Sequence, residues 1–187
     1  MPVFQWETIS EDVIFESPHL RLLGHQLKDP HQNLRKSTYY IIDAEHWGHV
    51  IALTEKKELI LVKQYRHAAK EITLEFPGGI IHKSEDPLQA IQRELREETG
   101  YLPARMEPLG VFYPNPALQT NKLFSFIAYD CSLQTSQCLD EDEHVDVVLM
   151  PLAAFQDLIQ SNKSQWNHGL MLASVALAYP KLFSLKT

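Results

Sequence analysis

The chain has 187 residues, of which 44% are hydrophobic and 22% are charged, proportions that suit one globular domain with or without a smaller attached unit. Its 17 basic and 24 acidic residues give a formal net charge of −7. Duplex nucleic acid favours basic surfaces, so this balance argues against such a partner. A small anionic substrate stays compatible with it, because a bound divalent cation can reverse the local field.

The two cysteines, Cys131 and Cys138, form no CxxC pair, so we expect two free thiols in a reducing compartment rather than a zinc site. The nine histidines contain no HxxxH pair. The N-terminal MPVFQWETIS lacks the basic and apolar regions of a secretory signal, and the apolar stretch 170–178 is too short to span a bilayer. The sequence therefore predicts a cytoplasmic protein without a membrane partner.

In chain order, the first half of the sequence predicts strands. A polar cluster at 28–33 separates two β-rich runs, which is typical of a hairpin, and 55–57 would form the turn of a second hairpin. The strands that we expect in this half lie at 20–27, 37–42, 50–54, 58–64 and 71–76.

The clearest helix covers 87–99. Asp86 suits the N-cap, Pro87 suits the first helical position, and Gln89 completes a spacing like that of a capping box. Gly100 can end the helix in the left-handed conformation.

The rest of the chain predicts three strands, at 111–113, 123–129 and 145–150, and two helices, at 151–160 and 169–178. We expect Pro180 to stop the last helix. Strands with helices before and after them indicate an α/β fold, in which helices cover a mixed sheet.

Helix 87–99 carries an apolar stripe about 60° wide and, beside it, an acidic face. The stripe is formed by Leu88, Ile91 and Leu95, and the acidic face by Glu94, Glu97 and Glu98. Carboxylates this close repel one another unless some are protonated or a cation lies among them. Such a run can be a solvated helix face, or it can be a Mg²⁺ site for a phosphorylated substrate.

The residues before the helix favour the metal site. Residues 76–79, Phe-Pro-Gly-Gly, predict a tight turn at which backbone groups can approach a metal or phosphate closely. Glu85 adds a further carboxylate from the loop. Arg93 can pair with Glu97 one turn later, or it can reach back to Glu85 and hold the loop against the helix.

This segment resembles the Nudix box, and every position that the box restricts to one residue type matches. The matching residues are Gly79, Glu85, Arg93, Glu94, Leu95, Glu97, Glu98 and Gly100. Tyr101 departs from the pattern, which usually has an aliphatic residue there, and this should affect packing more than chemistry. The resemblance implies a Nudix-type α/β/α sandwich with a mixed sheet.

The resemblance also implies Mg²⁺-dependent cleavage of a nucleoside diphosphate linkage, with Mn²⁺ as a substitute cation. By that resemblance, Glu94, Glu98 and the carbonyl of Gly78 hold the metal, and Glu97 assists in catalysis. The residues that shape the loop are Gly79, Glu85 and Arg93.

Outside the box, the chain resembles the ADP-ribose pyrophosphatase and nucleotide-sugar branch. Arg66 precedes a Leu-Glu-Phe-Pro-Gly-Gly segment that contains Glu75, and both residues are expected at the substrate. Pro116 lies fifteen residues after the box, where ADP-ribose members share a proline, although its neighbours depart from their pattern. Arg66 could instead be a surface charge, and Pro116 an ordinary turn proline.

The acidic run 140–143 could likewise be a solvated loop. In the resembling branch, a loop at this place carries the catalytic glutamate, and Glu143 is favoured over Glu141. The expected reaction converts ADP-ribose to AMP and ribose 5-phosphate. The alternatives are another nucleotide sugar such as GDP-mannose, or a non-catalytic module that binds nucleotide sugars.

The expected organisation is a β-rich segment at 1–45 followed by the Nudix domain at 46–187. In the resembling branch such N-terminal segments pair with a second subunit, so a homodimer is expected.

Overall fold

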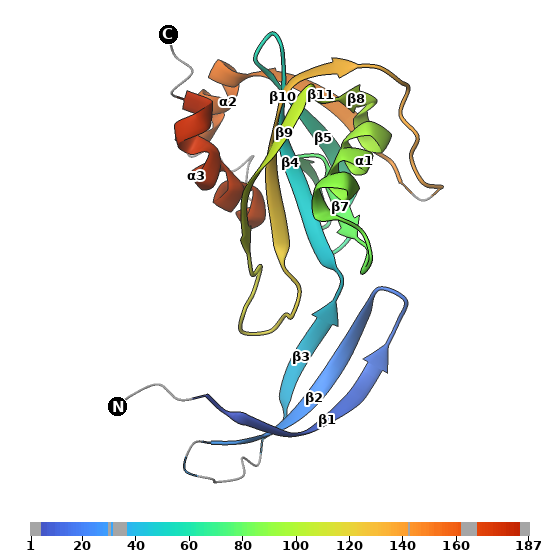
Figure 1. Cartoon of the computed structure of the whole chain (residues 1–187), viewed down its shortest axis with the longest axis vertical. Coiled ribbons are helices and arrows are strands. Elements are labelled where there is room, and N and C mark those ends of the chain that lie inside the picture. The colour runs from blue at the N-terminus through green and yellow to red at the C-terminus, as the bar shows by residue number, and fades with distance from the viewer. Residues whose placement is uncertain (1–4, 30, 32–36, 142, 162–167, 184–187) are drawn as a thin grey trace. The chain divides into compact units, whose positions relative to one another are not determined.

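The computed structural model of the chain describes residues 5–29, 31, 37–141, 143–161 and 168–183 (Figure 1). Pro30, Gln32 and Asn33 of the expected turn, and Asp142 of the acidic run, lie outside the described residues. The chain divides into two compact units, which are Met1–Glu45 with Tyr113–Lys122, and His46–Phe112 with Leu123–Thr187.

The first unit is an antiparallel sheet of three strands in the order β1-β2-β3. The strands are β1 (Glu7–Glu16), β2 (Leu20–Lys28) and β3 (Tyr39–Ala44). The segment Tyr113–Lys122 joins this sheet at β3, where the Thr120 hydroxyl donates a hydrogen bond of 2.7 Å to Asp43. All ten residues of β1 are exposed. The strand therefore has no buried face that alternating apolar residues in the sequence could have indicated.

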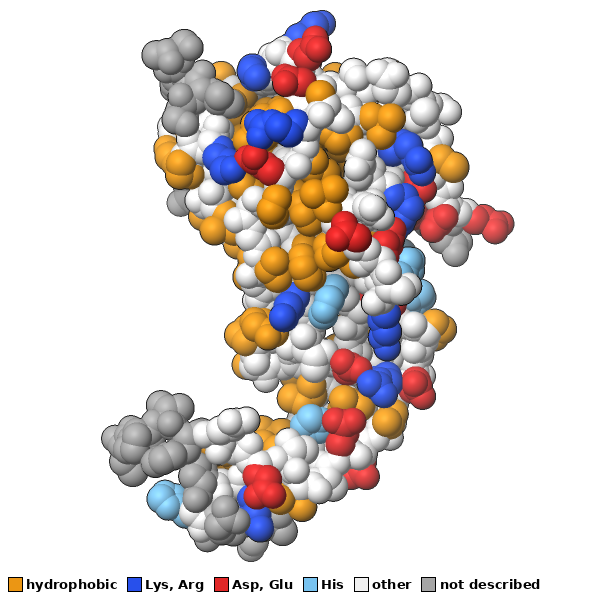
Figure 2. Space-filling view, in the orientation of Figure 1, with side chains coloured by type: hydrophobic (Ala, Val, Ile, Leu, Met, Phe, Trp, Pro, Cys, Tyr) orange, Lys and Arg blue, Asp and Glu red, His pale blue; other side chains and the backbone are white. Residues whose placement is uncertain are grey.

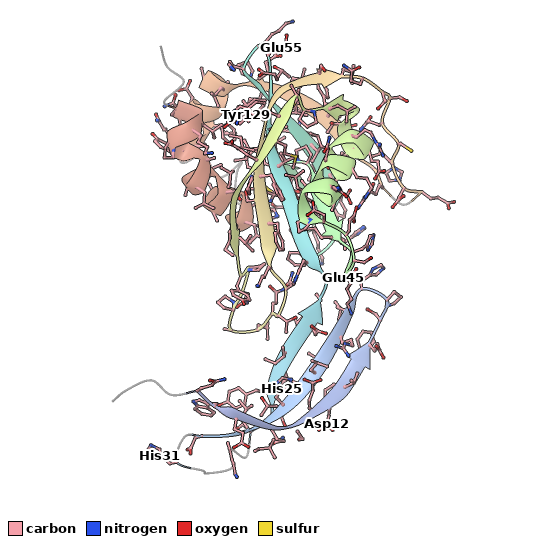
Figure 3. All side chains as sticks on the ribbon, viewed as in Figure 1. Asp12, His25, His31, Glu45, Glu55 and Tyr129 are labelled. Atoms are coloured by element: carbon pink, nitrogen blue, oxygen red, sulfur yellow. The ribbon has the colours of Figure 1, made fainter. Side chains whose placement is uncertain are left out.

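The second unit contains a mixed sheet with the order β11-β5-β4-β10-β8. In addition, β6 pairs with β5, β7 with β4 and β9 with β10, and only the β4–β10 pair is parallel among the described strand pairs. The strands are β4 (His46–Thr54), β5 (Glu58–Arg66), β6 (Glu71–Glu75), β7 (Gly78–Ile81), β8 (Tyr101–Leu102), β9 (Arg105–Phe112), β10 (Leu123–Leu133) and β11 (Asp146–Pro151). Glu55 marks the predicted turn between β4 and β5 (Figure 3).

Helices cover both faces of this sheet, with α1 on one face and α2 and α3 on the other (Figure 1). The side chains of β4 alternate between the hydrophobic cores on the two faces of the sheet. Val50 and Ala52 pack with α1, while Ile51 and Leu53 pack with α2 and α3. The helices are α1 (Pro87–Thr99), α2 (Leu152–Gln160) and α3 (Gly169–Phe183). The expected α/β/α sandwich with a mixed sheet is confirmed.

Helix α1 begins and ends where its caps predict. The Asp86 carboxylate accepts hydrogen bonds of 3.1 Å from the backbone N–H groups of Leu88 and Gln89, and Gly100 has a left-handed φ of 78°. Ile91 and Leu95 have no exposed surface. The predicted apolar stripe therefore seats the helix on the sheet.

Helix α3 corrects the prediction that Pro180 stops it, because it continues to Phe183. The extra turn is held by contacts outside the helix. Leu182 is buried in the core, Lys181 forms an ion pair with Glu107, and the rings of Tyr179 and Phe183 lie 4.6 Å apart. These contacts offset the backbone hydrogen bond that a proline cannot donate.

Figure 2 shows hydrophobic side chains gathered over β9, which α3 partly covers. The two elements approach closely at Gly110, where an added Cβ would lie 3.0 Å from the Leu177 side chain. Within the described part of the chain, every helix is too short or too polar to cross a membrane.

Both cysteines are free, as expected, but their surroundings differ. Cys131 is a buried residue of β10, and burial raises the pKa of its thiol to about 12, whereas Cys138 is exposed. We therefore expect a thiol reagent to label about one thiol per folded chain and about two after unfolding. Mass spectrometry should locate the first label on Cys138, and equal labelling of both residues in the folded protein would contradict this assignment.

Candidate active site

The site is built where β7 passes close to α1 and β4. The chain bends at Pro77 and then forms β7, in which Gly78 pairs with His49 and Gly79 pairs with Gly48. A Cβ added to Gly78 would lie 2.6 Å from the Cα of His49, and one added to Gly79 would lie 2.6 Å from the Glu94 carboxyl carbon. The tight turn expected over 76–79 is thus a bend followed by a strand, and glycine is needed for space.

Glu98 lies at the centre of this arrangement. Its side chain is almost fully buried, and one carboxylate oxygen accepts a hydrogen bond of 2.8 Å from the Gly78 backbone N–H. Burial raises the pKa of Glu98 to about 8 despite this hydrogen bond, and the negative charges of Glu94 and Glu143 act in the same direction. Three carboxylates therefore share one electrostatic environment.

Glu94 lies one turn earlier on the same face of α1. Burial raises the pKa of Glu94, and the charges of Glu143 and Glu97 add to this effect, while the Arg93 guanidinium opposes it. The net shift is upward even though Arg93 Nη1 lies 2.9 Å from a Glu94 oxygen. The positive charge already present does not fully compensate this acidic cluster.

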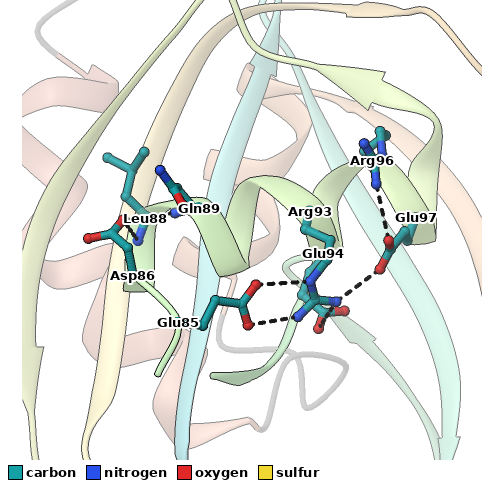
Figure 4. A network of polar contacts seen from close by, with 8 residues as sticks. All are labelled: Glu85, Asp86, Leu88, Gln89, Arg93, Glu94, Arg96 and Glu97. Carbon is teal, nitrogen blue, oxygen red and sulfur yellow. Dashed lines mark hydrogen bonds and ion pairs between the residues drawn. The ribbon is translucent and has the colours of Figure 1, made fainter. Parts of the chain in front are cut away.

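Arg93 is the main counter-charge of the helix face (Figure 4). Its guanidinium donates hydrogen bonds of 3.1 and 3.3 Å to Glu85 and one of 2.9 Å to Glu97. Both pairings considered from the sequence are thus present together. The hydrogen bond from Arg93 holds the pKa of Glu85 below its usual value, so the loop that carries Glu85 is held to α1 by a charged pair.

Arg66 and Glu75 form a second, bidentate pair across β5 and β6. Arg66 Nε and Nη2 donate hydrogen bonds of 2.8 and 2.7 Å to the two oxygens of Glu75, and the Thr73 hydroxyl donates a third of 2.5 Å. Burial alone would raise the pKa of Glu75, but these donors lower it. The Arg66 side chain is still 47% exposed, so the guanidinium can meet a ligand while Glu75 fixes its orientation.

The loop that carries Glu141 and Glu143 is anchored to the last turn of α1 by hydrogen bonds. Gln137 donates hydrogen bonds of 2.7 Å to the Glu98 carbonyl and 3.1 Å to the Val145 carbonyl, and the Cys138 backbone N–H donates to the Glu97 carbonyl. Glu141 and Glu143 are both exposed, and the charge of Glu143 raises the pKa values of Glu94 and Glu98.

The second unit thus brings together most of the residues singled out in the sequence. The box residues converge on β7 and α1, Arg66 and Glu75 lie at the ends of β5 and β6, and the loop of Glu143 is anchored to the same helix. Pro116 differs, because its segment belongs to the first compact unit.

Several residues of the site carried no signal in the sequence. Thr73 and Gln137 are ordinary polar residues there, and their hydrogen bonds depend on how the strands and the loop are placed. His49 is buried, and its Nε2 forms a hydrogen bond of 2.5 Å with Ser174 Oγ of α3. Burial lowers the pKa of His49 to about 4, so this imidazole is neutral at physiological pH.

The donors of the site fit a hard divalent cation. Among the described residues, no three His, Cys, Asp or Glu side chains already converge as a metal-binding group, and Glu94 and Glu97 are paired with Arg93 instead. Glu94 and Glu98 are nevertheless both shielded from water, and both have raised pKa values. A cation beside these oxygens would relieve the repulsion that raises those values.

We expect metal binding to release a proton. Because the pKa of Glu98 is about 8 in the metal-free protein, most Glu98 side chains carry a proton at pH 7 and must lose it to bind a cation. Calorimetry with Mg²⁺ in two buffers of different ionisation enthalpy should show release of about one proton per chain. The apparent affinity should rise by up to about tenfold per pH unit between about pH 6 and 8.

In Glu98→Gln, both the proton release and this rise in affinity should disappear. Tight binding of Mg²⁺ that is independent of pH in the unsubstituted protein would contradict a role of Glu98 as a ligand of the cation.

Comparison with known proteins agrees with this geometry. Residues 45–171 match the family described as NUDIX domain. An ADP-ribose pyrophosphatase of Bacillus subtilis is 30% identical over 164 residues, which cover 87% of this chain and 88% of that protein. A methanol dehydrogenase activator of Bacillus methanolicus is 32% identical over 151 residues, 80% of each protein.

A solved structure is also similar to this chain in its fold. The crystal structure of an ADP compounds hydrolase matches 100% of this chain and 98% of that one, with a TM-score of 0.85 at 20% identity. The family match covers more than half of the chain and includes β7, α1 and their carboxylates. With this match and that carboxylate site, the chain belongs to the Nudix family of hydrolases.

Proposed function

We propose that this chain hydrolyses the diphosphate linkage of ADP-ribose to AMP and ribose 5-phosphate, with Mg²⁺ as its cation and Mn²⁺ as a substitute. The observation that carries the proposal is the buried cluster of Glu94 and Glu98, with a third carboxylate, Glu143, close enough to raise both pKa values. The substrate is supported by the similarity to the Bacillus subtilis protein named ADP-ribose pyrophosphatase.

The cation would be held by the carboxylates of Glu94 and Glu98 and by the backbone carbonyl of Gly78. When bound, it would neutralise the charge of the diphosphate and make an adjacent water molecule more acidic. Glu97 assists in catalysis from the same face of α1. Gly79, Glu85 and Arg93 keep β7, the loop of Glu85 and α1 together.

Arg66 binds the anionic diphosphate in this proposal. Two of its donor atoms are engaged by Glu75, which fixes the plane of the guanidinium, and the exposed remainder can donate to phosphate oxygens. Its positive charge also faces the acidic cluster, since Glu98 and Glu143 both help to raise the pKa of Arg66. The diphosphate would therefore lie between Arg66 and the glutamates.

Glu143 is the preferred general base. It acts electrostatically on Glu94 and Glu98, and its loop is hydrogen-bonded to the end of α1. The base removes a proton from water, the water oxygen bonds to one phosphorus, and the P–O bond to the other phosphate breaks in line. Glu141 is the alternative base, on the same loop.

A substrate panel tests the proposal. We would assay ADP-ribose, ADP-glucose, GDP-mannose, NADH and dinucleoside polyphosphates with Mg²⁺ and with Mn²⁺, and identify the products by mass spectrometry. ADP-ribose should give the highest kcat/KM. Another nucleotide sugar as the best substrate would replace the substrate but keep the chemistry, and binding without turnover would favour the non-catalytic module.

Glu98→Gln should lower kcat by about two orders of magnitude or more, because it removes a charged metal ligand whose effect on the transition state is worth several kcal/mol. Glu55→Gln is the matched control, since Glu55 is exposed in the turn between β4 and β5 (Figure 3). A Glu98→Gln variant with full turnover in Mg²⁺ would show that the metal assignment is wrong.

The homodimer expected from the sequence remains part of the proposal, with residues 1–45 as its pairing segment. Within the first unit, the three-stranded sheet exposes an unusual number of large apolar side chains. They are Ile9, Val13, Ile14, Phe15, Leu20, Tyr39 and Tyr40. Such a sheet buries few side chains by itself, so pairing with a second copy would shield it from water.

Light scattering should give a mass about twice the 21.5 kDa of one chain. The double variant Val13→Asp/Phe15→Asp should be monomeric, because charged side chains on β1 oppose the burial of this strand against a second copy. Ile72→Asp, at a more exposed apolar site on β6, should remain dimeric. A monomer of the unsubstituted chain at micromolar concentration would rule out the dimer.

The cytoplasmic location and the division at residue 45 also stay predictions from the sequence.

A further inference from the structure

Helix α3 contacts the segment before β7 through residues on one of its faces. His168 Nε2, at the start of the helix, lies 3.9 Å from a Glu75 oxygen. The sulfur of Met171 accepts a hydrogen bond of 3.5 Å from the Phe76 backbone N–H. Ser174 Oγ lies 2.5 Å from His49 Nε2, on the strand that pairs with β7. Positions three apart share a helix face, so one side of α3 supports this whole segment.

The hydrogen bond between His49 and Ser174 is the most strongly buried of these contacts. His49 is 2% exposed and Ser174 is fully buried, so water cannot replace either partner. The imidazole is neutral there, and its ring also lies 5.8 Å from that of Phe76. The bond therefore restrains the His49 side chain from the face of the sheet that α3 covers.

The backbone of His49 is packed directly against Gly78. The two residues are paired in the β4–β7 register, and a Cβ added to Gly78 would lie 2.6 Å from the Cα of His49 and 2.7 Å from its Cβ. A shift of His49 would therefore move Gly78. The N–H of Gly78 in turn donates to Glu98, so the contacts run without a gap from Ser174 to Glu98.

We propose that Ser174 and His49 are positioning residues, which hold Gly78 and through it Glu98 in the geometry that a divalent cation requires. This inference rests on the metal site of the proposed function. The polar pair lies on the face of the sheet opposite α1, so the helix that carries the glutamates does not contain their support. Partners of metal ligands commonly tune metal affinity in this indirect way.

The chain offers a matched control for this hydroxyl. Ser125 on β10 is the register partner of His49 in the parallel pair, and its side chain is also buried. Its Oγ has no hydrogen-bond partner among the described residues. Ser125→Ala and Ser174→Ala thus remove the same atom from neighbouring places, but only the second breaks a hydrogen bond.

The decisive measurement is the affinity of the folded protein for Mg²⁺, by calorimetry without substrate. Ser174→Ala should weaken it by about tenfold, the lower end of what indirect partners of metal ligands contribute. Ser125→Ala should match the unsubstituted protein. If Ser174→Ala lowers the melting temperature but leaves Mg²⁺ affinity unchanged, the hydroxyl is merely structural and the inference is wrong.

His49→Leu guards against a failure of Ser174→Ala to fold. Leucine fills part of the space of the ring, and the free Ser174 hydroxyl can bond to the helix carbonyl of Leu170, so no buried polar atom is orphaned. The affinity should fall as in Ser174→Ala, and the double variant should be no weaker than either single variant. Additive losses would show that the two residues do not act as a pair.

The same titrations separate this inference from the proposed function. An unsubstituted protein that binds no Mg²⁺ would overturn both. A protein that binds Mg²⁺ with Glu98 and hydrolyses ADP-ribose, but whose Ser174→Ala and His49→Leu variants bind Mg²⁺ normally, would overturn this inference alone.

Discussion

The site depends on one close approach, that of β7 to α1 and β4, which only glycine allows. The backbone N–H of Gly78 can reach the buried carboxylate of Glu98 because neither Gly78 nor Gly79 carries a Cβ. The same lack of a side chain lets Glu94 lie against Gly79. This packing brings the two carboxylates together and largely out of water, and burial raises the pKa values of both.

The electrostatic balance around that approach is divided between two arginines. Arg93 pairs with Glu85, Glu94 and Glu97 and so limits the repulsion along α1, while Arg66 pairs with Glu75 and keeps an exposed side. Glu98 has no arginine in direct contact among the described ion pairs, and burial raises its pKa. In the proposed function, Glu98 is therefore the carboxylate most stabilised by the charge of a bound cation, and the exposed side of Arg66 stays accessible to an anion.

The sequence predicted what is determined locally. Asp86 and Gly100 set the ends of α1 through their own hydrogen bond and φ, and the acidic face followed from helical spacing alone. It missed what depends on distant partners. The exposed β1 has no periodic pattern, and α3 passes Pro180 because Leu182 and Lys181 find contacts elsewhere in the fold. His49 and Ser174 are 125 residues apart, so no motif could join them.

These two kinds of information bear on different parts of the function. The residues that we propose as ligands of the cation lie within one short segment, because a strand, a loop and a helix suffice to place them. The other residues of the proposed site come from separate parts of the chain. Arg66 and Glu75 come from the paired strands β5 and β6, the loop of Glu143 follows β10 in the chain, and Pro116 belongs to the other unit. Changes in those segments can alter the substrate while the close approach at Gly78, and with it the chemistry, stays the same.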